Sequence, residues 1–292
     1  SYSVTGVQTC ALPISFHLWA PDAYQGAPSP SAAFIASGSK VASFILLAKV
    51  VWIGFVGEEG SGAWRAMAPG WAPLLALFAA LSMVLGNVAA LAQRSVKRLL
   101  AYSAVAHAGY ALLGILANSE HGLLALLYYM ATYGLATLGA FGVLAALEGD
   151  SGDVTFEDVR GLAARSPGLA FCLLVFVLSL AGIPPLAGFF GKFYLFVVAL
   201  QWAPSSLGMI WLVALAIAMS AVSLYYYLQI LKQAYVIKAE SSAPGIQVSL
   251  PVRVTLWAAA VLVIVLGCVP GLLLSPWRSE ERRVGKECRS RW

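Results

Sequence analysis

Seven apolar segments, each more than about 20 residues long, dominate the sequence and are separated by short polar loops. A helix of about 20 apolar residues crosses the ~30 Å hydrocarbon core of a bilayer, because each residue adds about 1.5 Å. Only 11% of the residues are charged, against about 25% in soluble domains. These features exclude a soluble enzyme, a disordered chain and a disulfide-stapled secreted domain. They predict an all-α, polytopic bundle of transmembrane helices with spans at 29–56, 72–93, 97–117, 121–147, 168–202, 207–235 and 252–274.

The fifth segment, residues 168–202, is too long for one straight helix. It contains the string AGIPPLAGFFGK from Ala181 to Lys192. Pro184 and Pro185 lack backbone N–H donors and clash with the preceding turn. We therefore expect two half-helices with an unwound middle. Such breaks at membrane depth expose carbonyls and helix ends that bind ions, and they occur only beside protein or a water-filled cavity.

The two ends of the chain differ from the middle. Residues 1–15 have no charged side chain, and their apolar stretch is too short for a signal peptide. Residues 277–292 (WRSEERRVGKECRSRW) are hydrophilic and unpatterned. Both ends resemble translated sequencing-adaptor read-through, so we expect foreign tails that do not pack on a membrane domain of residues 16–276. A periplasmic leader and a basic juxtamembrane tail are the alternatives.

Charge and cysteine spacing restrict the partners and cofactors. Residues 277–292 carry six of the 18 Lys and Arg and three of the 13 acidic residues, which leaves 12 basic and 10 acidic residues elsewhere. This balance gives no basic face for nucleic acid. The four cysteines have no short spacing between any two. Iron–sulfur and zinc sites need such spacing, so no metal or cofactor site is predicted in this chain.

Basic residues gather in one set of loops. One set of span ends carries eight Lys and Arg, whereas the opposite set carries only Arg65. Lys and Arg accumulate in cytoplasmic loops, so the 94–98, 148–167 and 238–251 loops are predicted to face the cytoplasm. The eight residues are Arg94, Lys97, Arg98, Arg160, Arg165, Lys232, Lys238 and Arg253.

Two lysines lie within predicted spans, where a charge is costly and persists only beside protein or water. Lys40 is a dozen residues into the first span, with Ser37 on the same helix face. The alternative is a lysine that snorkels to the interface. Lys192 directly follows the Pro–Pro break, where desolvation favours the neutral amine and would let the side chain release and regain a proton. Alternatively, Lys192 only bonds a carbonyl that the kink frees.

His107 also lies mid-span, with Ser103 and Tyr110 on the same helix face. An imidazole both donates and accepts near neutral pH, which suits a proton relay. A histidine bonded to a neighbouring helix explains the pattern equally well. Hydroxyl stripes on other helices would extend a polar path at mid-membrane, although such stripes are more often interhelical contacts. They comprise Tyr129, Tyr133 and Thr137, and Ser220, Ser223 and Tyr227.

Four further polar residues lie at span edges. Lys97 and Arg98 begin a span at the cytoplasmic edge, where ordinary positive-inside anchoring explains both. His17 and Asp22 flank the string WAP in a Pro-rich connector, for which an interfacial turn is the default.

Three long strings resemble a known family: FHLWAPDAYQGAPSPSAAFIASGSKVASF, GNVAALAQRSVKRLLAYSAVAHAGY and LAGIPPLAGFFGKFYLF. They are similar to subunit N of the bacterial NADH:quinone oxidoreductase (complex I), an antiporter-like membrane subunit. The resemblance runs from about Phe16 to Pro276. It implies two inverted five-helix repeats, each with one broken helix, of which this chain would hold the second repeat. The family's fifth-helix glutamate and seventh-helix lysine would then lie before Phe16.

The resemblance also implies roles for single residues. Lys40 falls on the lysine of the family's eighth helix, and Lys192 falls on the lysine of its broken twelfth helix. Lys97 matches a lysine associated with proton transfer, and His17 matches a histidine after the seventh-helix lysine. With His107, these residues form the predicted proton-translocation set.

The function implied is a proton-translocating subunit that couples electron transfer from NADH to quinone to proton pumping. NADH, quinone, flavin and iron–sulfur clusters would be used by the complex, with no redox centre in this chain. Partners would be other membrane and hydrophilic subunits and the lipid bilayer, in a bacterial inner membrane. A cation/proton antiporter subunit and a passive scaffold are the alternatives. The PDAYQGAP and SGSK strings disfavour the former, and intramembrane Lys40 and Lys192 disfavour the latter.

Overall fold

The computed structural model describes residues 20–65, 67–148, 152–201, 208–238, 246 and 248–273, and these contain helices but no strand. The expectations for residues 1–15, for residues 277–292 and for His17 fall outside the described residues. In chain order, the elements are α2 (Ala20–Gly26), α3 (Ser29–Phe34), η2 (Ile35–Ser39), α4 (Lys40–Lys49), η3 (Val50–Gly54), α5 (Trp71–Leu91), α6 (Val96–Leu116), α7 (Glu120–Leu147), α8 (Phe156–Val159), α9 (Leu162–Arg165), α10 (Pro167–Ala181), α11 (Ala187–Gln201), α12 (Ile210–Tyr235) and α13 (Leu250–Cys268).

The helices match the predicted spans. Six helices of the described part are long and apolar enough to cross a membrane, and Ser29–Gly54, which joins α3, η2, α4 and η3, is the first of them. The fifth predicted segment forms two shorter apolar helices, α10 and α11. The prediction of an all-α polytopic bundle with one broken span is therefore confirmed.

The break follows from residues that cannot continue a helix. Gly182 ends α10 in the left-handed conformation with φ of 85°, which a glycine adopts without steric cost. The N–H groups of Gly182 and Ile183 both donate to the Leu178 carbonyl, as at many helix C-termini. Pro184 and Pro185 then fill the gap before α11 begins.

The first span also departs from a regular α-helix. Its turns widen to π-helix over η2, which ends directly before Lys40. Wide turns of this kind occur frequently at functional sites. The Ser37 hydroxyl of η2 donates to the Ala33 carbonyl of α3 at 2.6 Å.

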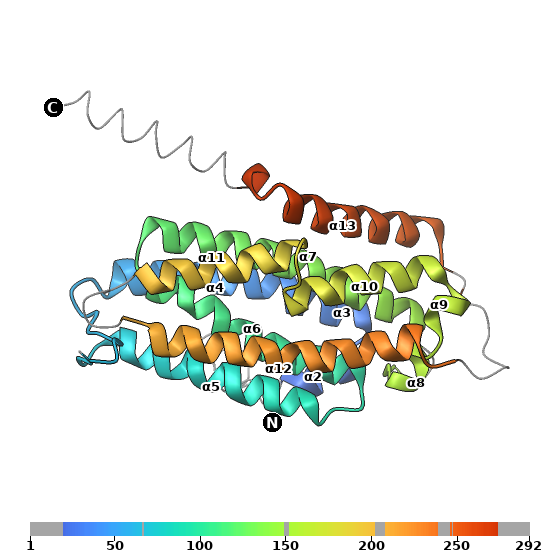
Figure 1. Ribbon diagram of the computed structural model, residues 1–292, viewed down its shortest axis with the longest axis horizontal. Helices are drawn as coiled ribbons and strands as arrows, with labels where there is room; N and C mark the ends of the chain where they lie inside the picture. Colours follow the sequence, from blue (N-terminus) through green and yellow to red (C-terminus); the bar gives the residue numbers. More distant parts are fainter. Residues whose placement is uncertain are drawn as a thin grey trace, which may run out of the picture.

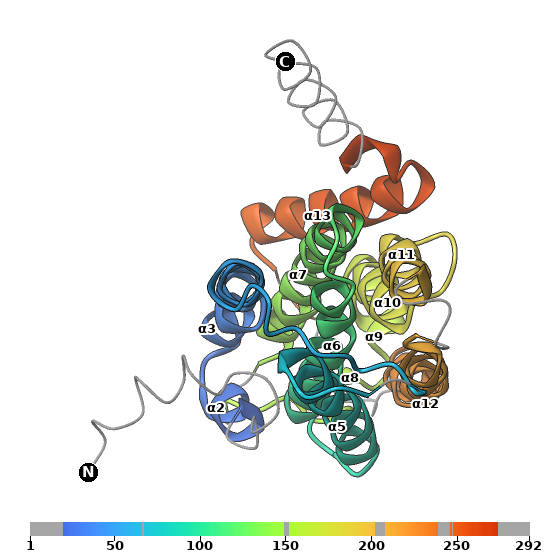
Figure 2. The same ribbon diagram turned by 90° about the vertical axis from the view of Figure 1, so that its left-hand side faces the viewer.

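Helix α6 forms the centre of the bundle. It packs against α2, α5, α7, α11 and α12, and Figure 2 shows it surrounded by other helices. Of its most apolar 18-residue window, 94% is buried, against 28% for the peripheral α13. Most side chains of α6 therefore contact other parts of the protein.

One end of the bundle collects the basic residues, and we call it the basic end. Helices α6, α10 and α13 begin there, α7 and α12 end there, and the short α8 and α9 lie beside them (Figure 1). The Gly161 N–H donates to the Gln233 carbonyl across this end. Its basic residues are Arg94, Lys97, Arg98, Arg160, Arg165, Lys232, Lys238 and Arg253.

Candidate functional site

His107 lies on α6 between two tyrosine hydroxyls. Its Nδ1 is 2.6 Å from the Tyr129 hydroxyl of α7, and its Nε2 is 3.2 Å from the Tyr227 hydroxyl of α12. In a neutral imidazole one nitrogen donates and the other accepts. His107 can therefore pass a proton from one hydroxyl to the other by changing tautomer.

Lys192 reaches back across the helix break. Its Nζ donates to the Ala181 carbonyl, the last residue of α10, at 3.1 Å and to the Ser220 hydroxyl of α12 at 3.0 Å. The ammonium also lies 5.1 Å from the centroid of the Tyr110 ring. The C-terminal end of α10 carries the negative pole of its helix dipole, which stabilises a cation there. The contact with the Ala181 carbonyl is the one expected if Lys192 bonds a carbonyl that the kink frees.

Lys40 is buried against the same central helix. Its Nζ donates to the Ala104 carbonyl of α6 at 2.6 Å, one turn before His107. The ammonium lies 5.9 Å from the centroid of the Tyr133 ring. Lys40 therefore points into the bundle and does not snorkel to its edge.

Tyr133 and a small cavity connect these three side chains. The centroid of the Tyr133 ring is 4.8 Å from that of the His107 ring, so Tyr133 contacts both His107 and the Lys40 ammonium. A cavity of about 10 Å³ lies between His107 and Lys192, close to the space that one water molecule needs. Its lining is His107, Tyr129, Thr132, Tyr133, Ala136, Ser179, Leu180, Gly188 and Lys192. We call Lys40, His107 and Lys192 the lysine–histidine row.

A second buried network adjoins this row. The Asn87 side chain of α5 donates to the Tyr110 hydroxyl at 3.3 Å and accepts from the Tyr226 hydroxyl at 2.9 Å. Sequence reasoning missed Asn87 and Tyr226. The one available signal was an amide within an apolar helix. The predicted Ser103–His107–Tyr110 face does not form one hydrogen-bond network. Tyr110 bonds to a residue of α5, whereas His107 bonds to residues of α7 and α12.

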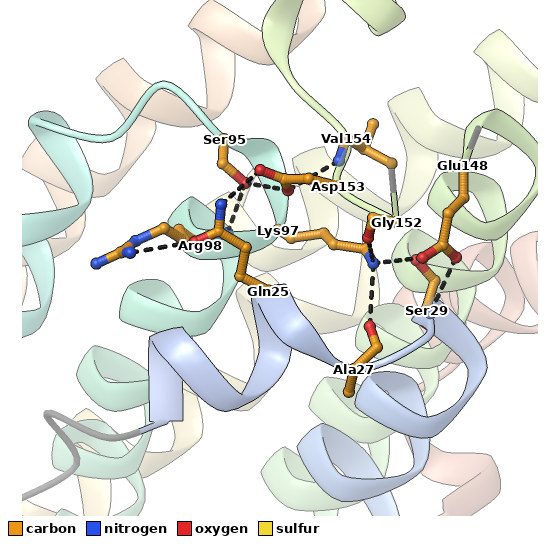
Figure 3. A network of polar contacts seen from close by, with 10 residues as sticks. All are labelled: Gln25, Ala27, Ser29, Ser95, Lys97, Arg98, Glu148, Gly152, Asp153 and Val154. Carbon is orange, nitrogen blue, oxygen red and sulfur yellow. Dashed lines mark hydrogen bonds and ion pairs between the residues drawn. The ribbon is translucent and has the colours of Figure 1, made fainter. Parts of the chain in front are cut away.

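Lys97 lies at the basic end of α6, about three turns from His107. Its side chain is 0% exposed and forms an ion pair with Glu148 at 2.6 Å (Figure 3). Burial by itself raises the pKa of Glu148, but hydrogen bonds from Lys97 and Ser29 outweigh it and hold that pKa below its usual value. Glu148 was missed because it directly follows the predicted span, in a loop whose charges suggested solvent exposure.

The structure therefore brings together three of the five predicted residues, Lys40, His107 and Lys192, and places Lys97 apart from them. Asp22 lies in the first turn of helix α2 and not in the expected interfacial turn, and it pairs with Arg98 at 2.9 Å on the surface of the basic end. No group of three or more His, Cys, Asp or Glu that could hold a metal ion occurs among the described residues.

Known proteins with similar sequences share one family. The family described as NADH:quinone oxidoreductase/Mrp antiporter, TM, matches residues 4–220. NADH-quinone oxidoreductase subunit N 2 of Acidobacterium capsulatum is 57% identical over 269 residues, which are 92% of this chain and 54% of that protein. The chain spans about half the length of the curated relatives it matches.

Solved structures show the same fold. A chain of respiratory complex I from Thermus thermophilus with bound Aureothin is 41% identical, with a TM-score of 0.74. The match covers 89% of this chain and 54% of that one. A chain of the Mrp complex from Dietzia sp. DQ12-45-1b is 21% identical, with a TM-score of 0.76, over 88% of this chain and 54% of that one. At that identity the second likeness shows the fold alone.

Proposed function

This chain belongs to the NADH:quinone oxidoreductase/Mrp antiporter transmembrane family, and we propose that it translocates protons as part of a subunit N. In that role it couples electron transfer from NADH to quinone to proton movement across a bacterial inner membrane. The redox groups, a flavin and iron–sulfur clusters, belong to partner subunits of the complex. The identity of 57% to a subunit N supports this choice.

The observation that carries the proposal is the lysine–histidine row. Among the described residues, no carboxylate pairs with Lys40 or Lys192, whose acceptors are carbonyls and a hydroxyl. A buried lysine without a fixed counter-charge can change its protonation state. His107 shares a cavity lining with Lys192, contacts the same Tyr133 ring as Lys40 and, with its two tyrosine hydroxyls, can relay a proton.

The remaining predicted residues take part at the edges of this path. Lys97 supplies a buried charge at the basic end, and His17 is proposed on the resemblance alone. Tyr133 and Thr137 support a hydrated path, because neither buried hydroxyl makes a hydrogen bond of good geometry within the described part of the chain.

Two other functions have less support. A cation/proton antiporter subunit has a similar fold, but the sequence identity to the Mrp chain is 21%, against 57% to a subunit N. A passive scaffold would have no use for Lys40 and Lys192, because burying each charge opposes folding. Co-purification with hydrophilic iron–sulfur subunits separates the three functions.

Substitution of Lys192 tests the proposal. Lys192→Ala should lower proton pumping by roughly tenfold or more, the scale of losing a proton-transfer group. Lys192→Arg should fail as well, because a guanidinium does not release its proton at accessible pH. NADH oxidation by artificial electron acceptors should persist, since the redox groups are proposed to lie elsewhere. The measurement is pumping by membrane vesicles, with assembly of the complex checked on a native gel.

Lys49→Ala is the matched control, because Lys49 lies on the same span as Lys40 but is exposed. It should leave pumping unchanged. Full pumping by a correctly assembled Lys192→Ala complex would reduce Lys192 to a structural partner of the broken helix.

A further inference from the structure

Lys97 has a complete set of acceptors around its ammonium group. Its Nζ donates to Glu148 Oε1 at 2.6 Å, to the Ala27 carbonyl at 3.1 Å and to the Gly152 carbonyl at 2.5 Å (Figure 3). A lysine ammonium has three N–H donors, so each can be used. One of the acceptors carries a full negative charge, which distinguishes Lys97 from Lys40 and Lys192.

Glu148 contacts a second element with its other oxygen. Glu148 Oε2 accepts the Ser29 backbone N–H at 3.0 Å, and Ser29 is the first residue of the Ser29–Gly54 span. The first N–H groups of a helix lack partners within the helix and favour a negative charge. One carboxylate therefore caps the span that carries Lys40 and also pairs with the helix that carries His107.

These contacts fix the first span against α6 at two levels. At the basic end, Lys97 of α6 holds the Ala27 carbonyl and the Glu148 carboxylate, which in turn holds Ser29. About three turns further along the span, Lys40 donates to Ala104 of α6. A slip of the span along α6 at the first level would separate Lys40 from Ala104 at the second.

Neighbouring side chains connect the same segments. Gln25 of α2 donates to Asp153 at 2.5 Å and accepts from Arg98 of α6 at 3.1 Å. Ser95, directly before α6, also donates to Asp153 at 2.6 Å. Figure 3 shows these side chains beside the Lys97–Glu148 pair. The start of α6, the α2–α3 connection and the loop after α7 are thus joined by several polar contacts.

We propose that Glu148 and Lys97 form a charged latch that positions Lys40 on α6, with Glu148 as a positioning residue. This inference rests on the proposed function. In the latch, the ion pair is a structural contact between α6 and the loop after α7, because breaking it would leave an uncompensated charge on Lys97, whose side chain is 0% exposed.

A double-mutant comparison tests the latch. The variants are Glu148→Gln, Lys97→Gln and the two together, in the assembled complex. Each single variant leaves one buried charge uncompensated and should lower the protons pumped per NADH oxidised by roughly tenfold. The double variant carries two amides that can hydrogen-bond without a net charge, so its ratio should return to within about twofold of the unmodified complex.

The control is the Glu157→Gln and Arg160→Gln pair, an ion pair at 3.6 Å at the same end whose side chains are 77% and 38% exposed. Its single and double variants should pump normally. The ratio of protons to NADH is informative because a loss of folding alone lowers the amount of complex and not its stoichiometry.

A double variant that pumps no better than Lys97→Gln overturns the latch and makes Lys97 a proton carrier. If the single variants do not assemble, the double variant tests the latch by itself. A double variant that assembles and pumps supports the latch, and a double variant that does not assemble or does not pump overturns it. Lys192→Ala, measured in parallel, separates the two ideas. Full pumping by Lys192→Ala would contradict the proposed function. If Lys192→Ala loses pumping but the Glu148→Gln and Lys97→Gln double variant does not recover it, only the latch is contradicted.

Discussion

Three buried lysines of this chain differ in the acceptors that surround them. Lys97 faces a carboxylate and two carbonyls, whereas Lys40 and Lys192 face only neutral oxygens. A nearby carboxylate favours the charged form of a lysine, and burial alone disfavours it. The same residue type therefore has an ion-pair partner at one depth of the bundle and only neutral acceptors at another, which is the difference on which the proposed roles rest.

The hydroxyl groups around His107 make a separate prediction. Tyr129→Phe removes the 2.6 Å partner of His107 Nδ1 and keeps the aromatic ring. We expect pumping to fall by roughly tenfold, because a relay histidine needs a partner on each nitrogen. Pumping by vesicles, at equal amounts of assembled complex, measures the effect.

Tyr225→Phe is the control for that change, because Tyr225 is an exposed tyrosine on α12. Tyr225→Phe also removes a hydroxyl group, and it should leave pumping unchanged. Equal pumping by the two variants would show that the Tyr129 hydroxyl is only an interhelical contact.

At the scale of elements, each lysine of the row follows an irregular helical segment. Lys40 comes directly after the wide turns of η2. Lys192 lies in the second turn of α11, after the break that separates it from α10. Irregular backbone at membrane depth persists where it contacts protein or lines a cavity. Lys192 contacts the Ala181 carbonyl at the break itself, whereas Lys40 contacts the Ala104 carbonyl of the regular helix α6.

Gly182 gives the prediction at this scale. Gly182→Ala would force an alanine into a left-handed conformation, and its Cβ would lie 3.1 Å from Lys192 Cδ. We expect a loss of about 1 kcal/mol in the free energy of unfolding, together with lower pumping because Lys192 must move. Thermal unfolding and vesicle pumping measure the two effects.

Gly57→Ala serves as the reference for Gly182→Ala, since Gly57 has a similar φ of 87° and no atom within 4 Å of an added Cβ. It should lose similar stability and retain pumping. Normal pumping by Gly182→Ala would mean that the shape of the break does not control Lys192.

For the whole molecule, the separation of charge predicts the orientation in the membrane. The basic end collects Lys and Arg from both halves of the described chain, whereas Arg65 lies in the loop before α5 at the opposite end. Because the cytoplasmic side carries such an excess, the basic end should face the cytoplasm.

Cysteine labelling in intact cells tests this orientation, in a background whose four native cysteines are replaced. Ser249→Cys, directly before α13, should react with an impermeant maleimide only after the cells are opened. Glu58→Cys, in the loop after η3, should react in intact cells. Both positions are exposed. The reverse pattern of labelling would show that the bundle has the opposite orientation, with the Lys97–Glu148 pair on the periplasmic side.

Much of the architecture could be predicted from the sequence because it depends on local chemistry. The length of each apolar segment gives the spans, since a bilayer has a fixed thickness. Pro184 and Pro185 give the break, since proline lacks a backbone donor. The burial of Lys40, His107 and Lys192 follows from their positions within apolar spans, because hydrocarbon excludes a charged side chain that has no polar surroundings.

The partners of these residues depend on tertiary packing. The Tyr227 hydroxyl that contacts His107 lies 120 residues away, and Glu148 lies 51 residues from Lys97. Which residues meet depends on the rotation and the depth of each helix, and a helix that is apolar on all sides encodes neither. The sequence by itself thus determined the spans, the break and the embedded ionisable residues. Only the tertiary structure decided that Lys97 has a carboxylate partner while Lys40 and Lys192 have neutral ones, because that difference arises from the packing of separate helices.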